Sequence, residues 1–224
     1  PLNQVEWLTP WRGLDALFVF TNYLLAFAVF FLARTMACLY FITNLEDDNL
    51  QIRCRKQLWY NTIPFLITFL LFLAFILSGD GYGILQIGSV CAGPYKYFYD
   101  LLEMPVNTLL FILGVIAVLF GIFKTLARPQ WKKGIWFAAP GTILTVLALF
   151  ILAGFNNTAF YPSYTDPASS LTIYNASSSE YTLKAMSYVS LIIPFIILYI
   201  WYVWRAMTRK PMSIQEIKDT EHKY

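Results

Sequence analysis

Two acidic residues next to a long apolar segment are the first candidates for chemistry in this sequence. Asp100 and Glu103 are three positions apart, so on a helix they lie on one face. Two carboxyl groups placed in this way could pass protons, or they could cap the positive end of the helix that follows. We favour the cap, because no acid lies in the middle of any apolar segment and a proton path across the chain is not supported.

Arg34 is the third candidate, because it interrupts the first apolar segment. It could extend its guanidinium to the headgroup region while its stem stays in hydrocarbon. Alternatively, it is a buried cation that faces a partner protein, a haem propionate or a quinone, since ionisable residues at membrane depth are often functional. We favour the first interpretation. No catalytic residue is predicted, and Asp100, Glu103 and Arg34 are kept as the candidates.

The sequence offers poor ligands for a metal or a haem. A haem iron needs a ligand such as His, Met or Cys, and the single histidine, His222, lies in a polar C-terminal tail. The other candidates lie in or beside apolar segments or in loops: Met36, Met104, Met186, Cys38, Cys54 and Cys91. We interpret the methionines as packing residues and the cysteines as free thiols. The chain is therefore predicted to bind no metal or cofactor.

The elements that must position these residues are membrane helices. Apolar residues make up 58% of the 224 residues and charged residues only 13%, and the mean hydropathy is +0.56. This composition is typical of an integral membrane protein, and nothing in it suggests nucleic-acid binding. We predict one all-α membrane domain over residues 1–224, a bundle of five transmembrane helices. The expected spans are 14–42, 57–78, 104–124, 134–154 and 184–206, followed by a tail at 207–224.

Three local features refine this prediction. The charged segment 44–56 has opposed charges at near-helical spacing and is interpreted as a helical extension. Pro194 is expected to kink the last span. Ser177 and Glu180 have the spacing of a capping box, which predicts that Ser177 begins a helix.

Basic residues predict the orientation. Segments 43–57, 124–133 and 205–224 hold twelve Lys and Arg, whereas the alternate segments hold three. Positive charge resists translocation, so the first set is expected in the cytoplasm. The C-terminus is then cytoplasmic and the loop 155–183 lies on the outer face.

Several stretches resemble one family in collinear order. They are WLTPWRGLDAL at 7–17, GDGYGI at 79–84, NTLLFILGV at 107–115, SSLTIYNASSSEYTLKAMSYVSLIIPFIILYIWYVWRAM at 169–207 and MSIQEIKDTEHKY at 212–224. Together they resemble subunit II of cytochrome bd-type quinol oxidases over essentially the whole chain. Members of that family normally carry a further helical bundle ahead of the matched segment, so the chain is expected to be the C-terminal portion of such a subunit.

The resemblance implies an electrogenic quinol:oxygen oxidoreductase in a bacterial cytoplasmic membrane. Haem b, haem d and the quinol-oxidising loop would belong to the larger partner, subunit I, and this chain would be its structural and proton-supplying partner. Proton-uptake residues proposed for the family lie mainly ahead of the matched segment, so none is carried over. The alternatives are a small transporter or channel subunit, or a membrane scaffold. A transporter should show broken helices and polar residues at mid-membrane, which the apolar segments nearly lack.

Overall fold

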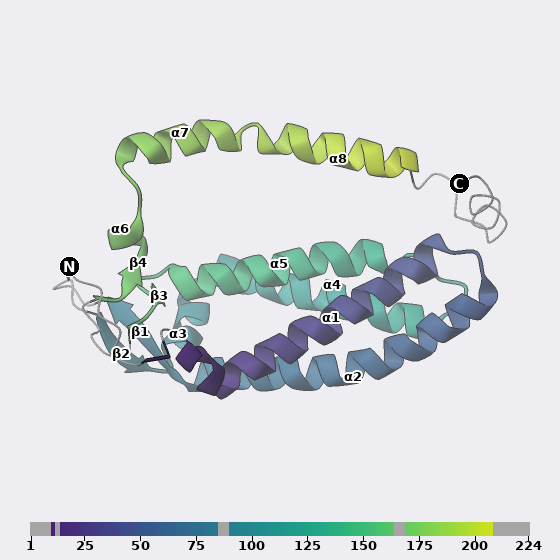
Figure 1. The fold of residues 1–224 in the computed structure, drawn as a ribbon, viewed down its shortest axis with the longest axis horizontal. Helices are drawn as coiled ribbons and strands as arrows, with labels where there is room; N and C mark the ends of the chain where they lie inside the picture. The colour runs from purple at the N-terminus through teal and green to yellow at the C-terminus, as the bar shows by residue number, and fades with distance from the viewer. Residues whose placement is uncertain (1–9, 12–13, 85–89, 164–168, 208–224) are drawn as a thin grey trace.

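Five helical segments in the computed structural model are long and apolar enough to cross a membrane (Figure 1). The structure describes residues 10–11, 14–84, 90–163 and 169–207. Within them the five segments are α1 (Phe20–Asn44), α2 (Asp48–Ser78), α4 (Pro105–Ala127), α5 (Ile135–Gly154) and the pair α7 (Glu180–Ser190) and α8 (Ile193–Met207). The prediction of an all-α bundle of five transmembrane helices is confirmed.

The first two helices differ from the predicted spans at their N-termini. Residues Leu14–Phe18 form a short 3-10 helix, η1, so α1 begins at Phe20. From Asp48 onward the charged segment is helical, as predicted, and belongs to α2, whereas residues 45–47 form the connection from α1; Asp47 caps the first turn of α2. One oxygen of Asp47 accepts hydrogen bonds from the backbone N–H groups of Asn49 and Leu50. The 31 residues of α2 span about 47 Å, well beyond the hydrocarbon core of a bilayer.

The last membrane segment is broken where the sequence predicts a kink. The α-helical pattern stops at Leu191 and resumes at Ile193, so Pro194 lies in the first turn of α8. Proline has no N–H, and only the first turn of a helix tolerates it without loss of a hydrogen bond. The predicted cap is wrong by two residues. Ser179 accepts a bond from the Thr182 N–H at the start of α7, because Ser177 instead bonds the preceding turn.

The bundle consists of two tight helix pairs, α1 with α2 and α4 with α5 (Figure 1). In the second pair the backbones touch. A Cβ added to Gly114 would lie 2.8 Å from the Gly141 carbonyl oxygen, and one on Gly141 would lie 2.7 Å from that of Gly114. Only glycine fits at such a crossing. Buried apolar side chains join the pairs: Leu39, Ile42, Leu58, Phe65, Val118, Ile122 and Ala138.

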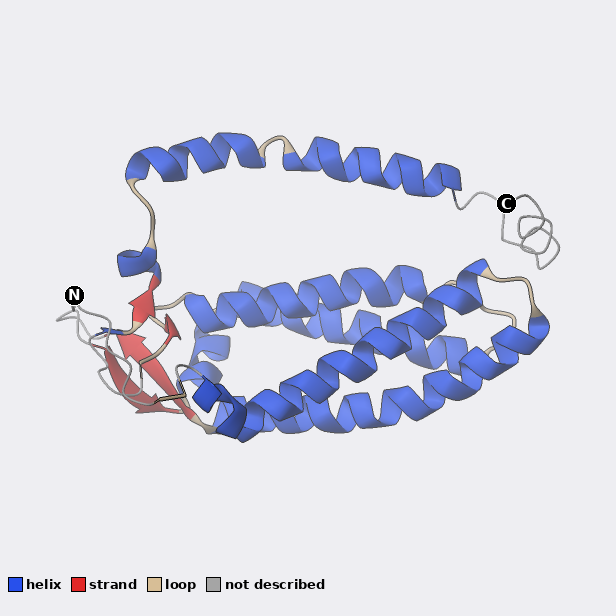
Figure 2. Cartoon of the chain, viewed as in Figure 1, coloured by secondary structure: helices blue, strands red, loops and turns tan. Residues whose placement is uncertain are grey.

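Helices α7 and α8 run beside this bundle and bury none of their side chains (Figures 1 and 2). A ring contact joins them to it, between Tyr40 and Trp204, whose centroids are 6.4 Å apart. The apolar surface of α8 therefore faces lipid or another protein.

One end of the bundle, called here the sheet end, holds the strands (Figure 2). Strands β1 (Asp80–Ile84) and β2 (Val90–Pro94) form an antiparallel hairpin in which Asp80 pairs with Pro94. Strands β3 (Ala159–Tyr161) and β4 (Leu171–Thr172) form a second pair. The short helices α3 (Lys96–Glu103) and α6 (Ile173–Ala176) complete this end. The strands were not predicted.

The opposite end, called here the turn end, holds the loop between α1 and α2 and the turn between α4 and α5 (Figure 1). The Thr43 hydroxyl donates to the Lys132 carbonyl oxygen at 2.5 Å and ties these two connections together. The described segments that the basic-residue count assigns to one side of the membrane therefore lie at one end of the bundle. The described part of the C-terminal segment is the end of α8, and residues 208–224, with His222, lie outside the described residues.

Candidate functional site

The short helix α3 brings the predicted carboxylates to the sheet end, but it places them in different environments. Asp100 is fully buried, with 0% of its surface exposed, whereas Glu103 is exposed. The residue four positions before Asp100 is Lys96, whose ammonium nitrogen lies 2.5 Å from Asp100 Oδ1. A buried carboxylate is costly unless it is paired and hydrogen-bonded, so its partners determine what Asp100 does.

Asp100 is the centre of a network that joins α3 to the loop after α5. Asn156 Nδ2 donates to Asp100 Oδ1 at 2.7 Å, and the Thr158 hydroxyl donates to Asp100 Oδ2 at 2.9 Å. Lys96 Nζ also donates to the Asn156 carbonyl oxygen at 3.0 Å. The two carboxylate oxygens are therefore both hydrogen-bonded, and their donors come from two segments that are more than fifty residues apart in the sequence.

Glu103 joins this network through the same amide. Asn156 Nδ2 lies 2.5 Å from Glu103 Oε2, so a single side-chain amide links the buried carboxylate to the exposed one. The structure thus brings the two predicted candidates together, as their spacing suggested. Glu103 is the member of the pair that solvent reaches.

The loop backbone is shaped so that Asn156 can reach α3. Asn156 and Asn157 have φ of 59° and 57°, the left-handed region in which asparagine is the most tolerant residue after glycine. Glycines in the hairpin make room for the lysine stem. A Cβ on Gly81 would lie 2.6 Å from the Lys96 Cβ, and one on Gly83 would lie 3.1 Å from the Lys96 Cε.

The capping role that we favoured for these carboxylates is not what the structure shows. Helix α4 begins after Met104 with no side-chain cap, and Pro105 occupies its first position, where no N–H needs a partner. The oxygens of Asp100 are used by Lys96, Asn156 and Thr158 instead. The network is therefore a clamp between segments rather than a helix cap.

Sequence analysis missed Lys96, Asn156 and Thr158 as members of this site. The spacing of Lys96 and Asp100 is the usual one for an ion pair on a helix and could have indicated the first partner. The pair Asn156-Asn157 directly after an apolar segment was visible as a turn signal. Nothing in the spacing showed that this turn contacts α3.

Arg34 lies apart from this network, on the exposed surface of α1. Its Nε donates to Asn61 Oδ1 of α2 at 2.9 Å, and its guanidinium carbon lies 5.7 Å from the Phe30 ring centroid. Leu39 lies beside the start of α5 at the turn end, because a Cβ on Gly134 would lie 2.9 Å from its side chain. Arg34 is five residues before Leu39 in α1, so it lies about 7.5 Å further from the turn end along the helix.

The side chains that could ligate a haem or a metal are spread over different parts of the described chain. Met36 packs against the buried core, Met104 joins α3 to α4, and Met186 is 62% exposed on α7. Cys38 and Cys54 also pack against the core, and Cys91 is an exposed thiol on β2. No group of three or more His, Cys, Asp and Glu side chains in the described ranges could hold a metal ion.

Comparison with known proteins gives the family. A family model described as cytochrome bd terminal oxidase subunit II matches residues 3–207, which is most of the chain. A search of curated proteins finds no match. The match agrees with the five apolar helices and covers the quoted stretches at 7–17, 79–84, 107–115 and 169–207. The chain therefore belongs to the cytochrome bd terminal oxidase subunit II family, and it is a multi-pass membrane component of a haem-containing respiratory oxidase.

Proposed function

We propose that this chain is the structural partner of a larger subunit I in a complex that oxidises quinol and reduces oxygen to water. The family match over residues 3–207 carries this proposal. Haems b and d are then held by subunit I, which the poor ligand set among the described residues supports. The isolated chain is expected to have no oxidase activity.

Two exposed features support packing against subunit I. Helices α7 and α8 bury none of their side chains in this chain. Arg34 uses one N–H for Asn61, and its other donors have no partner among the described residues, although it lies within the span of α1. A guanidinium at this depth favours an acceptor on a neighbouring subunit, because hydrocarbon offers none, and we now prefer this role to the extension towards the headgroups that the sequence favoured.

The orientation follows from the charges at the two ends. The turn end is rich in Lys and Arg, so it lies in the cytoplasm of a bacterial cell, together with the C-terminus. The sheet end and the loop 155–183 then lie on the outer face. In this proposal the carboxylate network lies on the outer side and the basic turn on the inner side of the cytoplasmic membrane.

The test is purification of the complete subunit from its native membrane. A tagged subunit is extracted in mild detergent, and a reduced-minus-oxidised visible spectrum is recorded. Haem b and haem d bands that co-purify with a larger partner are expected. A haem-free protein without a partner would contradict the proposal and favour a transporter subunit or a scaffold.

A second role, proton handling at the outer face, is favoured by the link between the exposed and the buried carboxylate. Glu103 is accessible, and Asn156 connects it to Asp100. If Glu103 accepts protons there, Glu103→Gln lowers quinol turnover by the assembled enzyme while haem content stays the same. The matched control is Glu180→Gln, since Glu180 is an exposed carboxylate near the same end that forms an ion pair with Lys184 outside this network. Unchanged turnover in Glu103→Gln rules this role out.

A further inference from the structure

The turn between α4 and α5 is held from inside the bundle through its backbone. The guanidinium of Arg55, from α2, donates to the carbonyl oxygens of Thr125, Pro129 and Trp131, the second at 2.5 Å and the third at 3.4 Å. The Thr43 hydroxyl, from α1, donates to the Lys132 carbonyl oxygen. The inner face of the turn is therefore fixed, and its side chains are free to project outward.

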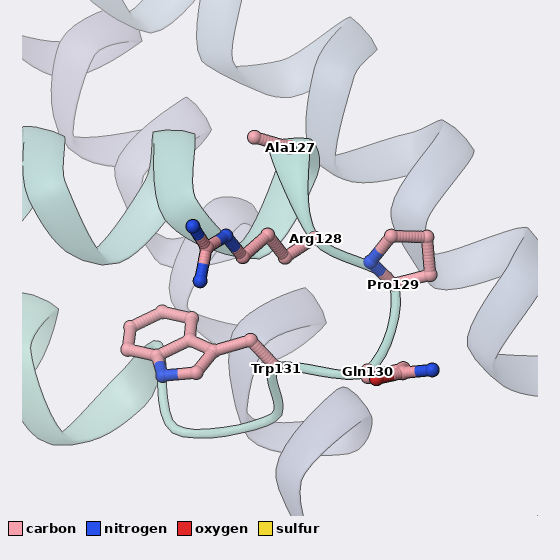
Figure 3. Close-up of a pocket in the computed structure, with 5 residues that line it drawn as sticks. All are labelled: Ala127, Arg128, Pro129, Gln130 and Trp131. Carbon is pink, nitrogen blue, oxygen red and sulfur yellow. The ribbon is translucent and has the colours of Figure 1, made fainter.

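An open recess of about 450 Å³ lies on the turn (Figure 3). It is lined by residues 127–131, and within it the side chains of Arg128 and Trp131 project to the same side, while Gln130 points away. The Trp131 N–H donates to the Arg128 carbonyl at 3.0 Å, which fixes the two residues on one tight turn. A cation and an aromatic ring thus share one wall of the recess.

A second cation is oriented by the same aromatic ring. Lys124 Nζ lies 4.6 Å from the centroid of Phe120 and 4.8 Å from that of Trp131, so its ammonium is held between two ring faces. Phe137 completes the cluster, with its centroid 5.8 Å from that of Trp131. Among the described residues, no carboxylate forms an ion pair with Lys124.

The cations at this end of α4 and α5 are closely spaced in the sequence. Four cations lie within ten positions: Lys124, Arg128, Lys132 and Lys133. None forms an ion pair with a described residue, and α5 has no acidic residue in its first turn. Three acids at the junction of α1 and α2, Glu46, Asp47 and Asp48, lie at the same end. None forms an ion pair with these cations, and one oxygen of Asp47 accepts backbone N–H groups of α2. An anion from outside the chain would relieve the repulsion among these cations.

We propose that this recess binds the phosphate of an anionic phospholipid headgroup. The 23 residues of α4 span about 35 Å and the 20 of α5 about 30 Å, enough to cross the hydrocarbon core, so the turn that joins them lies at headgroup level. Arg128 provides donors to the phosphate, Lys124 adds charge, and Trp131 sits at the interface that tryptophan prefers. The site does not depend on the proposed oxidase role, because it requires only that the bundle spans a membrane.

Lipid titration of the complete, delipidated complex followed by native mass spectrometry tests the site. Phosphatidylglycerol is expected to bind more tightly than phosphatidylcholine. Arg128→Gln is expected to lower the affinity for phosphatidylglycerol about fivefold, which is the effect of one cation near an anionic headgroup. The matched control is Arg53→Gln, which removes an exposed cation at the same end, outside the recess. A second variant, Trp131→Leu, is expected to weaken the same lipid while the complex stays assembled.

Three outcomes overturn the proposal. Equal effects of Arg128→Gln and Arg53→Gln would mean that the end attracts lipid only through its net charge. Equal binding of the two lipids would remove the role of the anionic headgroup. The third outcome is that inorganic phosphate at millimolar concentration displaces phosphatidylglycerol and that Arg128→Gln abolishes this displacement. It would assign the recess to a soluble anion instead.

Discussion

The two ends of the bundle are held together by opposite kinds of contact. At the sheet end, a buried side chain is the hub, since Asp100 receives donors from Lys96, Asn156 and Thr158. At the turn end, a side chain from α2 binds the backbone of the turn, since Arg55 donates to three carbonyl oxygens. One clamp joins four side chains to one another, whereas the other uses two side chains, Arg55 and Thr43, to bind backbone carbonyl oxygens.

This difference determines what each end can do besides holding the fold. At the sheet end, the polar side chains satisfy one another, so each replacement leaves a buried group without a partner. At the turn end, the clamp leaves the side chains of residues 128, 132 and 133 outside the bundle. Those side chains are free to contact the surroundings, which is why we infer a ligand there and a structural clamp at the opposite end.

The strongest way to break the comparison is Asp100→Asn. The substitution removes the buried charge that pairs with Lys96 and turns one acceptor into a donor that faces the Asn156 amide. Loss of one partner of a buried pair costs about 3–5 kcal/mol, and we expect about 2–4 kcal/mol here because Lys96 is partly exposed. Thermal unfolding of the purified complex measures it. Glu103→Gln, the exposed counterpart, should shift the midpoint far less, and equal shifts would mean that burial of Asp100 is unimportant.

The corresponding change at the turn end is Arg55→Leu. It removes a cation that bonds three carbonyl oxygens, and hydrogen bonds to charged groups contribute about 1.5–3 kcal/mol. We expect a loss of stability in that range. Arg55→Lys should recover only part of it, because an ammonium lacks the fork that spans several acceptors. Full recovery in the lysine variant would show that charge alone, and not the geometry of the guanidinium, holds the turn.

The helices of this molecule were predictable, because uncharged segments of about twenty residues have no other structure in a membrane. The helical extension at 44–56 and the break before Pro194 were also visible, since each depends on residues only a few positions apart. The sequence also predicted that the basic segments share one end of the bundle, because successive spans cross the membrane in opposite directions.

The sheet end was not predictable to the same degree. Its strands are two to five residues long, and Thr158 pairs with Gly83 across some seventy positions of sequence. Two partners of Asp100, Asn156 and Thr158, are separated from it in the sequence by the membrane helices α4 and α5. Spacing alone indicated that Asp100 and Glu103 share a face, but it could not show which of them is buried. That outcome depends on where the loop after α5 folds.

The smallest effect is expected at two adjacent residues of the sheet end, where the contribution of a side chain can be separated from that of the backbone conformation. Asn156 and Asn157 share the left-handed conformation, yet only the Asn156 side chain enters the network, while that of Asn157 is exposed. Asn156→Gly should cost about 1 kcal/mol, the net worth of its hydrogen bonds less the relief that glycine gives at positive φ. Asn157→Gly should be neutral or slightly stabilising. Unfolding midpoints measured side by side decide the matter: if both variants behave alike, backbone shape holds this end, and the sheet end is then built on the same principle as the turn end.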